Sequence, residues 1–278
     1  MKLAQCLLVK NEEDIIKYNI SYHKNIADVI IVTDNNSDDK TREILESLYQ
    51  KQVIDELIIE KDNNYNQYVW NNRMSLLAKH KYNCTHCFCC DADEFWDIDR
   101  EQLESGFLVS DIIKIPFHNY FPEVNKHFTE FKYRTTGKEY SSELLSKIYN
   151  LFNAVNSCEA NKYKAIYSLS NFVSNWQGNH GVDLSLDCYP LISKEMIIRH
   201  YPILSYDRFK NKIIQGGTAY NNNKEFNKNI GSHWRLLYNI YLQSENLFKE
   251  EYSKITHIDK DKLIDDNVII RDELNRYL

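Results

Sequence analysis

The sequence predicts an α/β fold with a mostly parallel central sheet and helices on both faces. Over the first 100 residues, short apolar runs alternate with segments whose apolar residues recur at helical spacing, which is typical of βαβ units with right-handed crossovers. The runs are almost continuously apolar, as expected for strands that are covered on both faces. A turn rich in helix-capping residues, 34–39, separates one of these runs from the helix that follows. Together these observations predict a Rossmann-like sheet.

Each element can be placed on the sequence. The expected strands are residues 3–9, 28–33, 53–59 and 85–90, and the expected helices are residues 14–26, 41–49 and 66–80. Later strands are expected at 111–120 and 195–200 and a strand pair within 165–176, with a loop at 178–183 and no clear period over 122–145. From residue 205 the pattern is helical, with interruptions at Gly216-Gly217 and Gly231 and an amphipathic helix at 234–248. We therefore expect an α/β domain at 1–204 and a helical C-terminal extension at 205–278, packed on that domain.

Composition and charge narrow the function. The 278 residues are 43% hydrophobic and 27% charged, which is ordinary for a globular protein with a sizeable core. The net charge of −6 argues against a general nucleic-acid binder, which would have a basic face. The chain opens without a secretory signal and has no apolar run of the ~18 residues that a membrane helix needs. A cytoplasmic protein with reduced thiols is expected.

The cysteines do not form a predicted metal site. Four of the seven lie within residues 84–90, in an expected strand. Neighbouring residues of a strand point to opposite faces, so the four sulfur atoms cannot converge tetrahedrally on zinc. These cysteines are interpreted as small hydrophobic residues of the core.

An acidic stretch ends the fourth strand. Asp91, Asp93 and Glu94 follow an apolar run, at the carboxyl end of a strand, where open α/β sheets bind ligands. Two carboxylates separated by one residue can face the same side of an extended backbone. They can then hold a hard divalent cation that also binds a diphosphate. A lone Asp-x-Asp is more often a plain acidic turn, so its neighbours have to decide between the two interpretations.

The loops after three strands should meet at one edge of the sheet. Asn11 and Glu12 follow the first strand, whereas Asp34, Asn36 and Asp39 follow the second. With the acidic stretch they form a pocket that suits a nucleoside, its phosphates being bridged by a metal ion. Neither GxGxxG nor GxxxxGK[ST] follows the first strand, which disfavours dinucleotide oxidoreductases and P-loop NTPases.

Three motifs in this order, residues 9–12, 34–41 and 91–95, resemble the GT-A glycosyltransferases of the family 2 type. The resemblance implies that Asp34 contacts the base and that the loop residues Asn11, Glu12 and Asn36 lie beside the nucleoside. It also implies that Asp91 faces ribose or sugar hydroxyls, as a second candidate metal ligand, and that Asp93 binds Mn²⁺ or Mg²⁺. Arg73, on the third helix, matches a basic residue near the diphosphate and could equally be a solvated helix charge.

The second half resembles a narrower group of the same type, through residues 178–180 and 200–202. Such enzymes often add a downstream metal ligand, frequently histidine. His200, at the end of a strand, is the first candidate and His180 the second, although either could be a structural histidine. Lys212, with the glycines after it, would belong to a loop that closes over the donor phosphates, or else to an ordinary interhelical loop.

The general base is the least defined residue. Inverting relatives use a carboxylate downstream of Asp-x-Asp, usually in a Glu-Asp pair that this chain lacks in that region. Asp183 is the nearest substitute and Asp187 follows it. Inverting and retaining stereochemistry therefore both stay open.

The expected function is a metal-dependent glycosyltransferase. It would move a sugar from a nucleotide-diphosphate donor, expected to be a UDP-sugar, to a hydroxyl of a surface glycan such as lipooligosaccharide or capsule. The acceptor could be a glycolipid, reached by peripheral contact of the 234–248 helix with the inner membrane face. A sugar-nucleotide nucleotidyltransferase is an alternative, but it should show a basic, Gly-rich loop after the first strand. A non-catalytic nucleotide- or glycan-binding module is another, and the intact Asp91 and Asp93 count against it.

Overall fold

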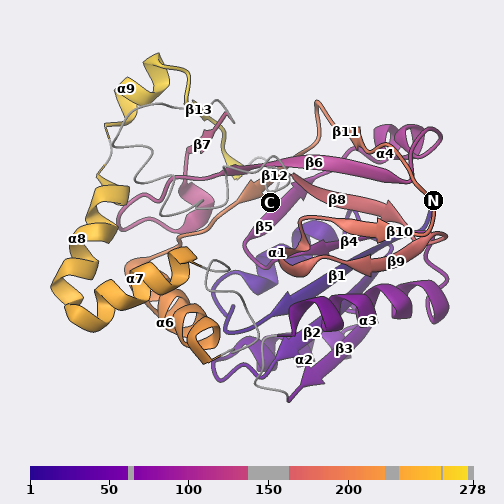
Figure 1. Ribbon diagram of the computed structural model, residues 1–278, viewed down its shortest axis with the longest axis horizontal. Helices are drawn as coiled ribbons and strands as arrows, with labels where there is room; N and C mark the ends of the chain where they lie inside the picture. Colours follow the sequence, from indigo (N-terminus) through magenta and orange to yellow (C-terminus); the bar gives the residue numbers. More distant parts are fainter. Residues whose placement is uncertain (62–65, 137–162, 223–231, 258, 275–278) are drawn as a thin grey trace. The chain divides into compact units, whose positions relative to one another are not determined.

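The computed structural model describes residues 1–61, 66–136, 163–222, 232–257 and 259–274 (Figure 1). The chain divides into two compact units, Met1–Phe117 with Ala160–Arg199, and His118–Glu159 with His200–Leu278. Among the described residues, a nine-stranded sheet has the order β3-β2-β1-β4-β8-β6-β12-β5, with β11 paired to β6. The domain boundary expected after residue 204 stays a prediction.

The first half of the sheet is parallel. β1 pairs in parallel with β2 and β4, and β2 with β3, as the alternation of strands and helices predicts. β8 then enters antiparallel to β4, and β6 is antiparallel to β8. The strands of this part are β1 (Leu3–Val9), β2 (Val29–Asn35), β3 (Glu56–Glu60), β4 (His86–Cys90), β8 (Tyr163–Ser168) and β6 (Ile112–Asn119).

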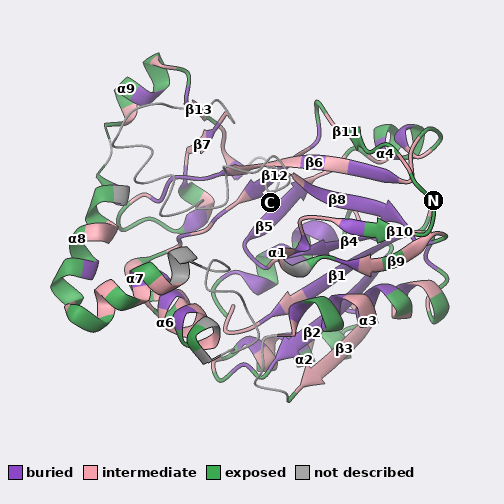
Figure 2. Ribbon diagram, in the orientation of Figure 1, coloured by how far each residue is buried: buried purple, intermediate pink, exposed green. Residues whose placement is uncertain are grey.

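Helices cover both faces of the parallel strands, and the side chains of β4 point alternately to these two faces. Cys87 and Cys89 pack under α3 (Gln67–His80), together with Met74 and Ala78 of that helix. Phe88 points to the opposite face, where its ring lies 5.9 Å from that of His23 on α1 (Ile16–His23). The central strands are buried along almost their whole length (Figure 2). The predicted α/β fold, with helices on both faces of the sheet, is confirmed, and the described cysteines are free.

Two further helices complete the first unit. α2 (Thr41–Gln50) follows the polar turn after β2, and α4 (Arg100–Gly106) begins at Asp99, whose carboxylate accepts hydrogen bonds from two backbone amides. The strand pair expected within 165–176 is wrong in its pairing. β9 (Phe172–Asn175) leaves the main sheet and pairs with β10 (Val182–Leu184), whereas β8 stays between β4 and β6. The sheet also includes β5 (Glu94–Asp97), β12 (Ile197–His200) and β11 (Leu191–Ile192).

The second unit is mainly helical. Its described elements are β7 (Tyr133–Thr135), which pairs with β13 (Ile269–Arg271), and the helices α6 (Tyr206–Asn222), α7 (Ser232–Gln243), α8 (Glu245–Thr256) and α9 (Lys260–Asp265). The single helix expected at 234–248 is wrong, because the chain breaks at Ser244. This residue has extended φ and ψ of −166° and 125°, and its hydroxyl accepts a hydrogen bond from the amide of Leu247, so it caps α8.

The interruption expected at Gly216-Gly217 is also wrong, since α6 continues through both glycines. Gly231 lies outside the described residues. Packing explains the glycine at 217, because a Cβ atom built there would lie 2.4 Å from Cβ and Cγ of Tyr238 on α7. Gly217 therefore permits close packing of α6 against α7, and both glycines lie within a helix and not in a loop.

Gly217→Ala is expected to destabilise the protein by about 1–2 kcal/mol. Overpacking a filled interface costs about 1–3 kcal/mol, and the gain of about 0.5–1 kcal/mol from removing a helical glycine offsets only part of that cost. Tyr238 cannot move aside easily, since the clash involves its Cβ. Urea unfolding of Gly217→Ala and of the matched control Gly216→Ala measures the difference. A Gly217→Ala variant as stable as the wild type would contradict the packing argument.

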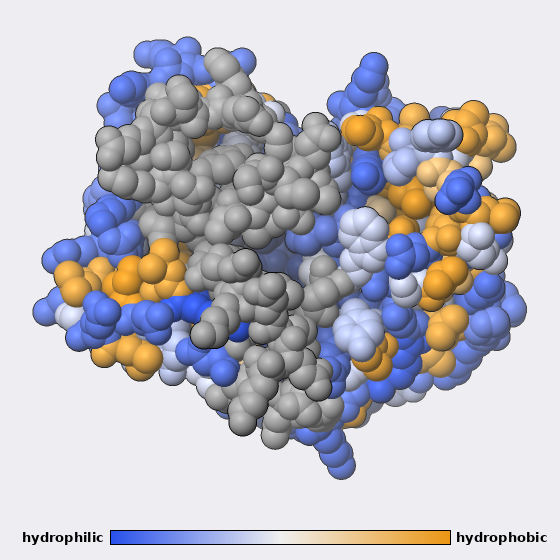
Figure 3. All heavy atoms as spheres, in the orientation of Figure 1, coloured by the Kyte–Doolittle hydropathy of each residue, from blue (hydrophilic) through white to orange (hydrophobic). Residues whose placement is uncertain are grey.

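Several apolar side chains are exposed near α4 and β11 (Figure 3). Leu108, Val109 and Tyr189 are 86%, 79% and 95% exposed. In the second unit, Leu236 and Leu242 of α7 are also exposed. The membrane contact expected for the 234–248 region stays a prediction. Within the described ranges, none of the helices combines the length and the apolar character that crossing a bilayer requires.

Candidate functional site

The loops after β1 and β2 are tied together at the carboxyl edge of the sheet. The amide of Asn11 donates to Oγ of Ser37 (3.0 Å), and Oδ1 of Asn11 accepts from the amide of Asp38 (2.9 Å). The amide of Glu12 donates to Oγ1 of Thr41 (2.7 Å). Because β4 lies on the other side of β1, the predicted convergence of three loops at one edge is confirmed. The nucleoside contacts expected of these residues stay predictions.

Asp34 is fully buried and has its own protein partners. Its Oδ2 accepts from Nε of Arg42 (2.9 Å), and its Oδ1 accepts from the amide (3.1 Å) and the hydroxyl (2.5 Å) of Ser37. Arg42 also reaches Oδ1 of Asn36 at 3.5 Å. In this arrangement Asp34 shapes the loop from within, and its contact with a base stays a prediction. The sequence interpretation missed Arg42, which is only partly exposed.

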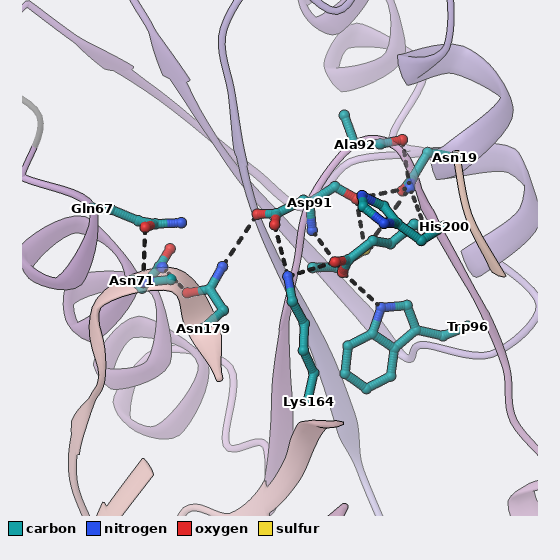
Figure 4. Close-up of polar contacts among 12 residues, drawn as sticks. Asn19, Gln67, Asn71, Asp91, Ala92, Trp96, Lys164, Asn179 and His200 are labelled. Carbon is teal, nitrogen blue, oxygen red and sulfur yellow. Dashed lines mark hydrogen bonds and ion pairs between the residues drawn. The ribbon is translucent and has the colours of Figure 1, made fainter. Parts of the chain in front are cut away.

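The acidic stretch forms a tight turn and not the extended segment that the sequence interpretation assumed. The amide of Glu94 donates to the carbonyl of Asp91 (3.1 Å), which closes a turn between β4 and β5. Asn19, buried on α1, holds this turn from inside: its Nδ2 donates to the carbonyls of Ala92 (3.0 Å) and Glu94 (2.7 Å). Figure 4 shows the amide of Asn19 pointing at the turn. The carboxylates are therefore placed by a buried hydrogen-bonded frame.

Lys164 of β8 is the centre of the site. Its Nζ lies 2.7 Å from Oδ2 of Asp91 and 2.5 Å from Oε1 of Glu94, and its side chain is only 3% exposed (Figure 4). Burial alone would lower the pKa of Lys164, but the charges of Asp91 and Glu94 outweigh it and raise the pKa well above its ordinary value. Sequence reasoning missed Lys164 because nothing in the local pattern shows that β8 inserts beside β4.

Glu94 is a supporting residue, with 4% of its side chain exposed. Besides Lys164, its carboxylate accepts hydrogen bonds through Oε2 from the amide of Asp91 (3.2 Å) and from Nε1 of Trp96 (3.3 Å). The carboxylate is thus enclosed by donors from three residues. The sequence interpretation left Glu94 without a role, and the structure makes it the inner partner of Lys164.

A chain of amides approaches Asp91 from α3. Asn179 Nδ2 donates to Oδ1 of Asp91 (3.2 Å), and Asn71 Nδ2 donates to Oδ1 of Asn179. Oε1 of Gln67 accepts from the amide of Gly178 (3.0 Å). Gly178 and Asn179 have φ of 84° and 60°, in the left-handed region that glycine and asparagine tolerate best. The motif at 178–180 therefore serves to present Asn179 to Asp91, a role that sequence reasoning did not assign.

The other candidate metal ligands are placed as follows. Asp93, in the acidic turn, is 6% exposed. His180 follows Asn179, and its ring centroid lies 6.2 Å from that of Phe117. His200 belongs to the second unit, where its Nδ1 lies 2.6 Å from Oδ1 of Asn119. The metal contacts of all three stay predictions.

The remaining predicted residues lie on three different elements. Asp183, on β10, accepts hydrogen bonds from Nε1 of Trp176 (2.8 Å) and Oγ of Ser174 (2.9 Å). Arg73, on α3, pairs through Nη1 with Oε2 of Glu60 (3.1 Å). Its Nε and Nη2 are buried without a hydrogen-bond partner among the described residues. Lys212 is half-buried on α6 of the second unit. Their roles as base and phosphate ligands stay predictions.

The chemistry of the turn fits a divalent metal only in part. Carboxylate oxygens are the ligands that Mg²⁺ and Mn²⁺ prefer. However, the carboxylates of Asp91 and Glu94 already share the ammonium group of Lys164. The described residues contain no cluster of three His, Cys, Asp or Glu side chains that could hold a metal ion. A metal site here would therefore depend on Asp93 and on oxygen atoms of the ligand.

Comparison with solved structures gives 76 similar chains, among them the following three. S. aureus TarS residues 1–349 in complex with UDP has 11% identity and a TM-score of 0.44, with 95% of this chain and 74% of that chain covered. The longer S. aureus TarS chain has 13% identity and a TM-score of 0.45, with 96% and 54% covered. The mannosyltransferase PcManGT from Pyrobaculum calidifontis, in complex with GDP-Man and Mn²⁺, has 10% identity and a TM-score of 0.42, with 91% and 73% covered.

The sequence itself decides the family. No curated protein matches the chain. The family described as "Glycosyl transferase family 2" matches residues 6–162, which is more than half of the chain and includes the loops after β1, β2 and β4. This match confirms the resemblance predicted from residues 9–12, 34–41 and 91–95. The chain is a glycosyltransferase and belongs to glycosyl transferase family 2.

Proposed function

We propose that this glycosyltransferase moves a sugar from a nucleotide-diphosphate donor, expected to be a UDP-sugar, to a hydroxyl of a surface glycan such as lipooligosaccharide or capsule. Residues 1–204 would bind the donor, and the protein would work in the cytoplasm, with peripheral contact at the inner membrane face for a glycolipid acceptor. Family membership supports the donor class. The observation that carries the proposal is the fixed but accessible carboxylate of Asp91 at the carboxyl end of β4.

Asp91 is suited to bind a sugar or ribose hydroxyl. Lys164 and Asn179 each donate to a different oxygen of its carboxylate, which fixes the plane of the group. The side chain is still 37% exposed, and a carboxylate oxygen has more than one acceptor position. A hydroxyl of the donor can therefore add to these two contacts without breaking either. Such positioning is a large part of how enzymes lower the barrier of group transfer.

Charge on the departing diphosphate is the second requirement of the reaction. A divalent cation, Mn²⁺ or Mg²⁺, would stabilise that charge when bound, with Asp93 as its ligand from the turn and His180 and His200 as further candidates. Arg73 and Lys212 are the cationic side chains proposed for the phosphates. Asp183 is the proposed base that takes the proton of the acceptor hydroxyl, since its carboxylate is exposed on β10.

A donor screen tests this function. The purified protein is incubated with UDP-, GDP- and other nucleotide sugars, and nucleotide release is measured with Mn²⁺, with Mg²⁺ and with EDTA. We expect release from one donor class, strong inhibition by EDTA, and a fall in kcat of about 100-fold or more in Asp93→Asn, in the range seen when a stabilising group for developing charge is removed.

Glu101→Gln, at an exposed carboxylate on α4, is the control and should keep full activity. Release that persists unchanged with EDTA and in Asp93→Asn would rule out the metal role. No release and no binding of any nucleotide sugar would rule out the proposed function as a whole.

A further inference from the structure

We infer that Lys164 is a built-in cation of the donor site that keeps Asp91 and Glu94 out of the coordination shell of any divalent metal. This inference rests on the proposed function, because it concerns how the same site divides its carboxylates between metal and sugar. In this arrangement Asp91 is a sugar-positioning residue whose charge is already balanced by the protein. The metal is left to Asp93 and to the phosphate oxygens of the donor.

The geometry of the pair carries the inference. The ammonium nitrogen of Lys164 lies 2.7 Å from Oδ2 of Asp91 and 2.5 Å from Oε1 of Glu94, so one cation neutralises two carboxylates in part. A divalent ion bound to the same Oδ2 at about 2.1 Å would lie at most about 5 Å from that nitrogen. Repulsion between the two cations at this separation is strong where solvent is largely excluded. The lysine and the metal therefore compete for Asp91.

Lys164 cannot move aside as a surface lysine would. Its side chain is 3% exposed and extends from β8, a central strand that is paired on both sides. Glu94 holds the ammonium group from the inner side and is itself held by Trp96 and by the amide of Asp91. The cation is thus a fixed part of the fold, present before any ligand arrives.

The contact of the second carboxylate oxygen of Asp91 also favours sugar binding over metal binding by this residue. Asn179 donates to Oδ1 and is held in turn by Asn71 from α3. A carboxylate with a neutralised charge and a fixed plane is a poor metal ligand. It is still a good acceptor for a neutral hydroxyl. The arrangement around Asp91 therefore favours recognition of a sugar over binding of a metal ion.

Metal titration without nucleotide tests the inference directly. Binding of Mn²⁺ alone is measured by the loss of the free-ion electron paramagnetic resonance signal. Lys164→Gln should bind Mn²⁺ at least tenfold more tightly than the wild type, because the ammonium group that competes with the metal for the carboxylates of Asp91 and Glu94 is then gone. Lys114→Gln, at another lysine of the same sheet on β6, should leave the affinity unchanged. A folded Lys164→Gln variant with the affinity of the wild type would overturn the inference.

Two further variants keep the test decisive if Lys164→Gln does not fold. Lys164→Gln combined with Glu94→Gln removes one charge of each sign and should still bind Mn²⁺ at least tenfold more tightly, through Asp91 and Asp93. At saturating UDP, Asp93→Asn should lose at least tenfold in affinity for Mn²⁺, and this loss should be larger than that of Asp91→Asn. An equal loss in both single variants would contradict the inference.

The outcomes separate this inference from the proposed function. If UDP and Mn²⁺ bind together to the wild type but Lys164→Gln gains no metal affinity, the transferase proposal stands and the role of Lys164 is wrong. If the wild type binds no nucleotide, the proposed function fails. The titration with Mn²⁺ alone then still decides whether the lysine blocks the carboxylates.

Discussion

Lys164→Met is expected to lower the free energy of unfolding by about 3–5 kcal/mol, the usual cost of removing one partner of a buried charged group. The variant removes the cation beside Glu94 and leaves the charged carboxylate in a site where only 4% of its side chain is exposed. Folded proteins of this size have about 5–15 kcal/mol of stability, so the variant should fold but with a much lower midpoint in urea.

Lys81→Met is the control for losing a lysine as such. Lys81 also pairs with an acid, Glu56, but 54% of its side chain is exposed, and exposed pairs contribute little. The loss in Lys164→Met should also shrink at acidic pH, because protonation of the carboxylates removes the uncompensated charge. A Lys164→Met variant with the urea midpoint of Lys81→Met would show that the buried pair adds nothing to stability.

The stability of the protein should also fall steeply in mild acid because of His23. This residue is fully buried, with its Nδ1 2.9 Å from the carbonyl of Asn19 and its Nε2 accepting from the amide of Trp96 at 3.1 Å. The second contact requires a bare nitrogen, so the ring is neutral with its proton on Nδ1. Burial lowers the pKa of His23 from 6.5 to about 3, opposed in part by the hydrogen bond to Asn19.

The sign of the pH effect follows from this depressed pKa. Between pH 6.5 and about 3, the unfolded chain binds a proton at this histidine that the folded protein does not bind. The contribution of His23 to the free energy of unfolding is therefore complete above pH 6.5 and is lost as the pH falls towards 3. For one proton, each pH unit in this range changes the free energy of unfolding by about 1.4 kcal/mol, so the wild type should lose about 2–3 kcal/mol of stability between pH 7 and 4.5. Urea unfolding of the wild type at these two pH values measures it.

His23→Gln isolates the contribution of this residue. Glutamine can still accept from the amide of Trp96 but cannot take up a proton, so this variant should lose about 2–3 kcal/mol less than the wild type on acidification. His86→Gln is the comparison. Burial also lowers the pKa of His86, to about 4, but its partly exposed ring should give a smaller effect. Equal acid sensitivity of the wild type and His23→Gln would contradict the argument.

The parallel part of the fold could be predicted from the sequence because its signals are local. Each of the first four strands is a largely apolar run, and the helices between them repeat their apolar residues at helical spacing. The sequence-based predictions are wrong where the local structure depends on a contact with a residue that is distant in the sequence or on a capping hydrogen bond. Gly217 looks like a helix breaker, but it is there to let Tyr238 approach. Ser244 looks like one polar residue in a helix, but its hydroxyl caps the next helix.

The site could be predicted only as far as its acids and loops. The loops after β1, β2 and β4 meet because of the sheet topology. The sequence therefore predicts that the loop of Asn11 lies beside the loop of Ser37, although it does not predict the hydrogen bond between these two residues. Lys164 and Asn179 were not predicted, because they come from segments more than 70 residues beyond Asp91 along the chain. The assumption of an extended Asp-x-Asp failed for a related reason, since Asn19 bends that segment into a turn.

The amide of Asn19 has a practical meaning for engineering this site. Because one buried side chain of α1 holds the backbone on both sides of Asp93, the acids take their position from the interior of the protein and not from the surface loop. A change deep in α1 could therefore misplace the carboxylates without touching any ligand. Anyone who alters the donor preference should leave that interior scaffold intact and vary the residues that face the solvent.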